Sequence, residues 1–233
     1  MKIEELLDAY VAITSSENQN LINVAFDEMN SSQYEEAASH FDQLYAKDSS
    51  DYMSYFFRAY CKSFCGRRGD VYPDSQKLTS AFELACKKAI ADKKNLDVNL
   101  NLIMIMFKEG MENLAYNAVE EVSVDSNGNT HTSNPTKYKI KSNARESLFA
   151  LIRDNVDLFK ENDELKEFAL TYLKDIVDYG LDRFGAIIVS LDPSYAPVLE
   201  EKKKKARIKR IIGIVVIAVI ILSIISCGMF LSC

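Results

Sequence analysis

The sequence is poor in proline, and the placement of its few prolines already narrows the fold. All four (Pro73, Pro135, Pro193 and Pro197) fall between segments of apolar periodicity, where they cannot interrupt the interior of a helix. No stretch sustains the alternation of apolar and polar residues that a half-buried strand requires. Helix is therefore the only regular structure that the pattern supports, and we predict an all-α fold.

Groups that carry catalysis are equally scarce. The chain has two histidines: His40 falls on the polar side of a predicted helix, and His131 lies in a polar segment. We find no glycine-rich phosphate loop, no cluster of metal ligands and no nucleophile elbow. Adjacent carboxylates such as Glu35 and Glu36 point about 100° apart on a helix, so they do not converge as an acid–base pair. We therefore predict no catalytic site, no metal and no cofactor.

The five cysteines do not indicate a disulfide framework. Cys61 and Cys86 sit within apolar stripes, as small buried hydrophobic residues often do. Cys61 and Cys65 lie one helical turn apart, but no second pair of ligands accompanies them, and a structural zinc site usually has paired spacings. Free thiols are the simpler interpretation.

Charge is distributed unevenly along the chain. All 34 acidic residues, but only 21 of the 28 basic ones, lie within residues 1–201, which gives this part a net charge of about −13. A protein that binds nucleic acid needs a basic face, so we predict no nucleic-acid partner. The remaining basic residues form a collar, which we assign to a membrane surface: Lys202, Lys203, Lys204, Lys205, Arg207, Lys209 and Arg210.

An uncharged apolar run, residues 211–233, follows the collar. A helix of that length covers roughly 35 Å, against about 30 Å for the hydrocarbon core of a bilayer. We predict a transmembrane helix here. Because cytoplasmic flanks carry the excess of Lys and Arg, residues 1–201 are expected in the cytoplasm. The predicted protein is a single-pass, tail-anchored membrane protein whose span contacts the lipid bilayer.

Apolar residues at helical spacing mark the helices before the collar. The first is predicted over residues 3–13, the second over about 18–30, and the third up to about Lys47. Ser32 followed by Glu35 has the spacing of a capping box and predicts the start of that third helix. The segment Asp48-Ser49-Ser50-Asp51 is expected to end this helix and to cap the next one.

Residues 18–65 resemble a tetratricopeptide repeat. Ala25 and Ala59 are 34 residues apart, which is the period of that family. The proline that usually closes the second helix is missing near Ser49, and the register is lost after Cys65. The residues that match the register of the first repeat are Leu21, Val24, Ala25, Tyr34, Ala37, Phe41 and Leu44. The resemblance implies antiparallel helical hairpins and a groove that binds a protein.

The domains follow from these patterns. We predict a tetratricopeptide-like helical domain over 1–123 and a flexible polar linker over 124–137. A helical hairpin over 138–190, a proline-containing stalk with the basic collar over 191–210, and the transmembrane helix complete the chain.

We place the partner groove on the inner helices of the repeats. Its predicted residues are Asn23, Asp27, Tyr55, Arg58 and Lys62. The inner helix over about 18–30 has no basic residue, so we expect a carboxylate to be repelled and a basic or apolar helix to be the partner. The alternative is that another helix of the chain, such as 3–13, fills this groove.

The resulting prediction is a tail-anchored adaptor or scaffold that binds an unidentified protein. Three alternatives remain open. One is a helical subunit that supports a membrane complex without a separate binding activity. Another is a fusion protein of the SNARE kind, although its uninterrupted heptads are broken here by Gly180, Gly185 and two prolines. The last is an enzyme whose site is assembled from distant residues.

Overall fold

A computed structural model describes residues 3–65, 71–118, 121–124 and 130–230. Side chains are not described at 121–124, 131, 132 and 222–230. The chain forms two compact units, residues 1–168 and 169–233, and the division falls inside one helix. The helical class predicted from the sequence is confirmed.

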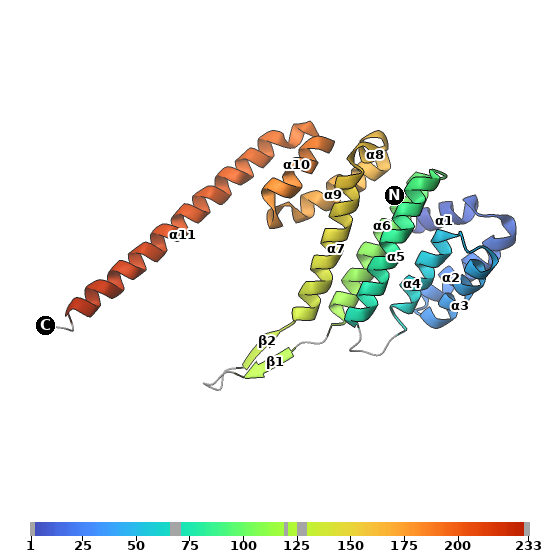
Figure 1. Ribbon diagram of the computed structural model, residues 1–233, viewed down its shortest axis with the longest axis horizontal. Coiled ribbons are helices and arrows are strands. Elements are labelled where there is room, and N and C mark those ends of the chain that lie inside the picture. Colours follow the sequence, from blue (N-terminus) through green and yellow to red (C-terminus); the bar gives the residue numbers. More distant parts are fainter. Residues whose placement is uncertain (1–2, 66–70, 119–120, 125–129, 231–233) are drawn as a thin grey trace. The chain divides into compact units, whose positions relative to one another are not determined.

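The first unit is built from helices that pack in chain order (Figure 1). Each helix from the second to the seventh contacts the next one along the chain. The elements of this unit are α1 (Ile3–Ile13), α2 (Ser16–Asn30), α3 (Tyr34–Lys47), α4 (Tyr52–Lys62), α5 (Val71–Asp92), α6 (Leu96–Tyr116), β1 (Glu121–Val124), β2 (Thr130–Ser133), α7 (Pro135–Asp154), α8 (Val156–Glu161) and the first turns of α9 (Asp163–Ile176).

Helix α6 is the centre of this unit. It packs against α1, α4, α5 and α7, and most of its residues from Asn99 to Ala115 are buried. A Cβ atom at Gly110 would lie 2.8 Å from the ring of Tyr60 on α4 and 3.1 Å from Leu78 on α5. The lack of a side chain at Gly110 therefore allows α6 to approach both helices.

Aromatic side chains fill the space between α1 and α4. Phe57 lies 5.1 Å, centroid to centroid, from Phe41 on α3 and 5.0 Å from Phe26 on α2. Tyr10 on α1 lies 5.8 Å from Phe57. Aromatic pairs at 4.5–7 Å add to the stabilisation that burial itself provides. The apolar stripes read from the sequence thus meet in one core.

The predicted caps have different outcomes. The predicted segment 48–51 does cap α4, and the capping residue is Asp51, whose Oδ1 accepts hydrogen bonds from the backbone N–H groups of Met53 and Ser54 at 3.0 Å. The capping box is wrong. Ser32 has a φ of +60°, which an N-cap residue does not adopt, and Gln33 occupies the N-cap of α3 without a side-chain bond.

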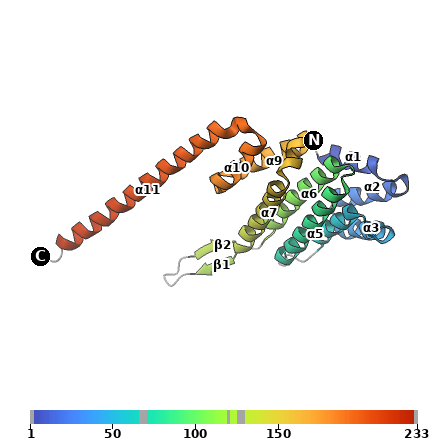
Figure 2. The same cartoon turned by 45° about the horizontal axis from the view of Figure 1, so that its top comes forward.

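A β-hairpin occupies part of the predicted flexible linker (Figure 2). β1 pairs antiparallel with β2, from Glu121 opposite Ser133 to Val124 opposite Thr130. Residues 125–129 of the linker lie outside the described residues. The linker does not separate two bodies, because α6 and α7 on either side of it pack together. Four-residue strands are too short to show a clear alternation in the sequence.

The second unit continues from α9 through η1 (Val177–Tyr179), α10 (Leu181–Leu191), η2 (Pro193–Tyr195) and α11 (Ala196–Phe230). Helix α10 packs against α11, where a Cβ at Gly185 would clash with the side chain of Leu199. The predicted stalk is helical instead, because Pro193 and Pro197 stand in the first turns of η2 and α11, where a proline costs no hydrogen bond.

The predicted transmembrane helix is corrected by the structure. Within the described residues, no helix combines the length and the apolar character needed to cross a membrane. The apolar run with described side chains is 211–221, which covers roughly 16 Å, about half of a hydrocarbon core. Residues 222–233 lie outside the described side chains. The prediction of a single-pass, tail-anchored, membrane-localised protein with residues 1–201 in the cytoplasm is therefore wrong.

Candidate functional site

A cleft of about 590 Å³ lies between α4 and α5. This volume falls within the range of about 300–1,000 Å³ that is typical of ligand sites. Its lining consists of Tyr55, Arg58, Ala59, Lys62, Ser63, Pro73, Gln76, Lys77 and Ser80. Three of these side chains are cationic and none is acidic. In a chain with a net charge of −6, this composition sets the cleft apart.

Helical spacing explains how these residues come together. Tyr55, Arg58 and Lys62 are three and four positions apart, so they share one side of α4. Gln76 and Ser80 share one side of α5 with Lys77 in the same way. The opposite sides of both helices carry the apolar stripes that enter the core, such as Phe57 and Phe82. The cleft is therefore the polar side of a packed helix pair.

Two cations in the cleft share one carboxylate. Arg58 and Lys62 both form ion pairs with Asp42 on α3, and the Nζ of Lys62 lies 2.8 Å from its Oδ2. Arg58 also lies over the ring of Tyr45, 6.0 Å from the centroid. One positive charge at this end of the cleft is thus left over after pairing. Lys62 is half exposed and its amino group can reach a ligand.

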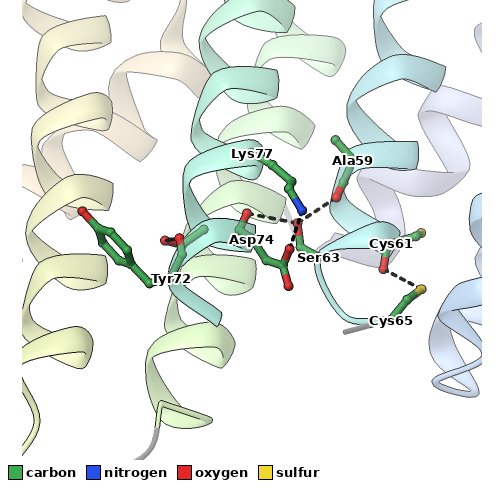
Figure 3. Close-up of polar contacts among 8 residues, drawn as sticks. Ala59, Cys61, Ser63, Cys65, Tyr72, Asp74 and Lys77 are labelled. Atoms are coloured by element: carbon green, nitrogen blue, oxygen red, sulfur yellow. Dashed lines mark hydrogen bonds and ion pairs between the residues drawn. The ribbon is translucent and has the colours of Figure 1, made fainter. Parts of the chain in front are cut away.

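The other end of the cleft is formed by the start of α5 and the residue that follows α4 (Figure 3). Lys77 pairs with Asp74 at 3.0 Å, and its side chain is 72% exposed. The Ser63 hydroxyl donates a 2.8 Å hydrogen bond to the carbonyl of Ala59 and lies 3.5 Å from that of Asp74. These bonds hold the end of α4 against α5 and leave Lys77 at the rim.

The structure brings together three of the five predicted groove residues. Tyr55, Arg58 and Lys62 line the cleft, whereas Asn23 and Asp27 on α2 are exposed and take no part in it. Sequence reasoning missed the contribution of α5. The signal was present in the polar residues of 73–80, whose spacing of three and four positions matches one side of a helix.

The expectation that the groove repels carboxylates stays a prediction, but the residues on which it was based do not form this cleft. That expectation counted Asp27 and Glu28 of α2 in the groove, but neither lines the cleft. It also left out Lys77, which comes from a helix outside the predicted repeat. The lining thus contains three cations and no carboxylate, and the carboxylates of Asp42 and Asp74 that pair with these cations lie outside it.

The alternative occupant of the groove, helix 3–13, lies elsewhere. Tyr10 of α1 packs on Phe26 and Phe57, while α1 also runs along α6. Phe57 and Tyr55 are two positions apart, so they point about 200° apart around α4. Helix α1 therefore covers the opposite side of α4 and leaves the cleft open.

A second groove, between α5 and α7, differs in both size and charge. It has a volume of about 310 Å³ and an apolar floor that includes Phe82 and Leu151. Its charged residues are Glu83 and Asp154 against a single cation, Lys87. This groove is slightly acidic, like the chain as a whole, and has no comparable excess of cations.

Two thiols close to the cleft are poor nucleophiles. Burial raises the pKa of Cys61 far above its ordinary value. Partial burial also raises the pKa of the exposed Cys65 thiol, and the carboxylates of Glu35 and Glu36 add to the shift. Cys65 Sγ lies 3.3 Å from the Cys61 carbonyl oxygen, to which it donates a weak hydrogen bond. Nothing in this arrangement activates a thiolate.

The basic collar is partly used inside the second unit. Lys202 pairs with Asp178 at 2.8 Å, and Lys203 pairs with Asp182 at 3.0 Å. Lys205 pairs with Glu201 one turn earlier at 2.7 Å. The hydrogen bond from Lys202 to Asp178 raises the pKa of the lysine. The remaining collar residues are exposed: Lys204, Arg207, Lys209 and Arg210.

Among the described residues, no group of three or more His, Cys, Asp or Glu side chains could hold a metal ion. Comparison with known proteins gives no match to any family model, curated protein sequence or solved structure. The function must therefore be inferred from the geometry of the cleft.

Proposed function

We propose that the first unit is a protein-binding module of tetratricopeptide-like design, which acts by binding and not by catalysis. Its ligand is an acidic segment of a partner protein, bound in the cleft between α4 and α5. The observation that carries this proposal is the lining of the cleft, which contains Arg58, Lys62 and Lys77 and no acidic residue, while the two cations of α4 share the single carboxylate of Asp42. The packing of each helix against its successor supports the likeness to helical repeats.

The electrostatics favour this ligand over a basic one. Charge-assisted hydrogen bonds from Lys and Arg to carboxylates are roughly twice as strong as neutral ones. Asp42 and Asp74 already pair with these cations, but two cations share Asp42. An incoming carboxylate would pair with the positive charge that Asp42 leaves uncompensated. Tyr55 and Pro73 offer apolar surface to the residues that flank this carboxylate in the ligand.

Calorimetric titration of the full chain tests the proposal. A short peptide rich in Glu should bind, and the same peptide with Lys in place of Glu should not. K62Q/K77Q should lower the affinity for the acidic peptide by about tenfold or more, which corresponds to about 1.4 kcal/mol of binding free energy. K88Q is the control for a single charge, since Lys88 lies on α5 with its side chain exposed and does not line the cleft.

Three results would refute the proposal in different ways. The same loss of binding free energy per removed charge in K88Q as in K62Q/K77Q would mean a non-specific charge effect. Binding of the basic peptide alone would reverse the ligand chemistry. Binding of neither peptide would favour a helical subunit without a separate binding activity.

A further inference from the structure

Helix α1 is attached to the first unit differently from the helices that follow it. Each of α2 to α7 packs on its neighbours along the chain, whereas α1 has its most extensive contact with α6. Two residues, Thr14 and Ser15, join it to α2. Because α2 to α7 pack on one another without it, α1 can leave its place without separating these helices.

The contact of α1 depends on an apolar pair one helical turn apart. Leu6 is fully buried and Tyr10 is 5% exposed, while every other residue of the helix is partly or fully exposed. The Tyr10 ring lies 6.2 Å from Phe26 on α2 and 5.8 Å from Phe57 on α4. Glu4 and Asp8 lie on the solvent side. Leu6 and Tyr10 thus have the i, i+4 spacing with which the apolar residues of an amphipathic helix bind in an apolar groove.

We infer that the face formed by α2, α4 and α6 is a second binding surface, which receives an amphipathic helix from a partner protein and is occupied by α1 in the free chain. The partner helix carries a large aliphatic residue and, four positions later, an aromatic one, as Leu6 and Tyr10 do. It displaces α1 and takes over the contacts with Phe26 and Phe57. This surface goes beyond the proposed function, since it lies on the opposite side of α4 from the cleft.

The presence of α1 on this surface lowers the affinity of the surface for a partner helix. A ligand that needs the open state binds with an affinity reduced by the fraction of molecules in which α1 has left. A helix tethered by two residues competes at a high effective concentration, in the millimolar range for short linkers. The unmodified chain should therefore bind the partner helix weakly, and loss of the apolar pair on α1 should raise the affinity.

A peptide of residues 3–14 is the probe, because its sequence is known to fit the surface. Labelled with a fluorophore, it should bind the full-length L6A/Y10A variant at least tenfold more tightly than the unmodified chain, as measured by anisotropy. The same peptide with alanine at the positions of Leu6 and Tyr10 should bind neither protein. Equal affinity for the variant and the unmodified chain would overturn the inference.

Hydrogen exchange of the unmodified chain provides a second measurement if the variant does not fold. The amides of α1 should exchange much faster than those of α6, through an opening that leaves α2 to α6 protected. Equal protection of α1 and α6 would show that α1 opens only on global unfolding, and would overturn the inference. A dimer of the chain formed by exchange of α1 would assign the surface to a second copy instead and would overturn it too.

Discussion

Asp42 is the residue that limits the charge of the cleft. It pairs with both Arg58 and Lys62, and its side chain is 41% exposed. An exposed ion pair contributes little to stability, with a median of about 0–1 kcal/mol. The carboxylate acts instead as a competitor for any anionic ligand of these two cations.

Asp42→Asn should therefore improve binding of the acidic peptide. The acidic peptide should bind the variant several-fold more tightly, on the order of 1 kcal/mol, because both cations lose their internal partner. Titration with the same peptide gives the result directly. Weaker binding by a folded D42N protein would mean that Asp42 positions the cations and does not compete for them.

Phe41 is the residue on which the core between α2 and α4 depends. It is fully buried, 5.1 Å from the stacked ring of Phe57 and 5.8 Å from Phe26. Phe41→Ala should lower the free energy of unfolding by about 3–5 kcal/mol, through lost burial and the cavity left behind. Urea denaturation measures this change. Tyr116→Ala is the control, since that ring is 82% exposed and its loss should cost less than about 1 kcal/mol.

Cys65 should react slowly although it is exposed. Partial burial and the carboxylates of Glu35 and Glu36 raise its pKa, so a smaller fraction is thiolate at a given pH. Alkylation by iodoacetamide at pH 8, followed at the Cys65 peptide by mass spectrometry, should be slower in the native than in the unfolded chain. E35Q/E36Q should speed the native reaction. A native rate equal to that of the unfolded chain would contradict the raised pKa.

At the scale of elements, the packing of α6 depends on one glycine. Gly110→Ala improves helix propensity by about 1 kcal/mol, but its Cβ would lie 2.8 Å from the buried ring of Tyr60. Overpacking of this kind typically costs about 1–3 kcal/mol, so we expect a net loss of stability on thermal unfolding. Gly213→Ala on α11 is the control, because nothing lies within 4 Å of its Cβ position. A stabilised G110A protein would mean that α4 and α6 have room to separate.

Helices with a strong apolar stripe were predicted well, and elements without one were not. The first helix was expected over 3–13 and has those bounds. The hairpin of β1 and β2 was missed because four-residue strands in a polar segment carry no long periodic signal. Ser32 has the sequence of a cap, but the turn after α2 places it in a left-handed conformation that sequence spacing does not reveal.

For the whole molecule, three of the nine residues that line the candidate site were predicted from the sequence. Tyr55, Arg58 and Lys62 were identified because they lie on one helix, where spacing determines which residues share a side. Lys77 comes from α5, and the packing of α4 against α5 is a tertiary contact that spacing cannot supply. The charge of the site was misjudged for the same reason.

The length and composition of the apolar run after the collar led to the wrong prediction of a membrane span. The described part of α11 from Ile211 to Ile221 is apolar and exposed, and its Ile and Val residues are 51–61% accessible. Yet the described chain contains no helix that meets the length and apolar requirements of a membrane span. The function proposed for the first unit does not depend on this segment.

The location of the bound peptide tests the central claim most directly. Hydrogen exchange of the full chain, with and without the acidic peptide, should show new protection confined to α4 and to the part of α5 between Pro73 and Ser80. K62Q/K77Q should abolish that protection, and K88Q should retain it. Protection in α1 and α6 alone, or in the groove between α5 and α7, would contradict the assignment of the binding site to the cleft.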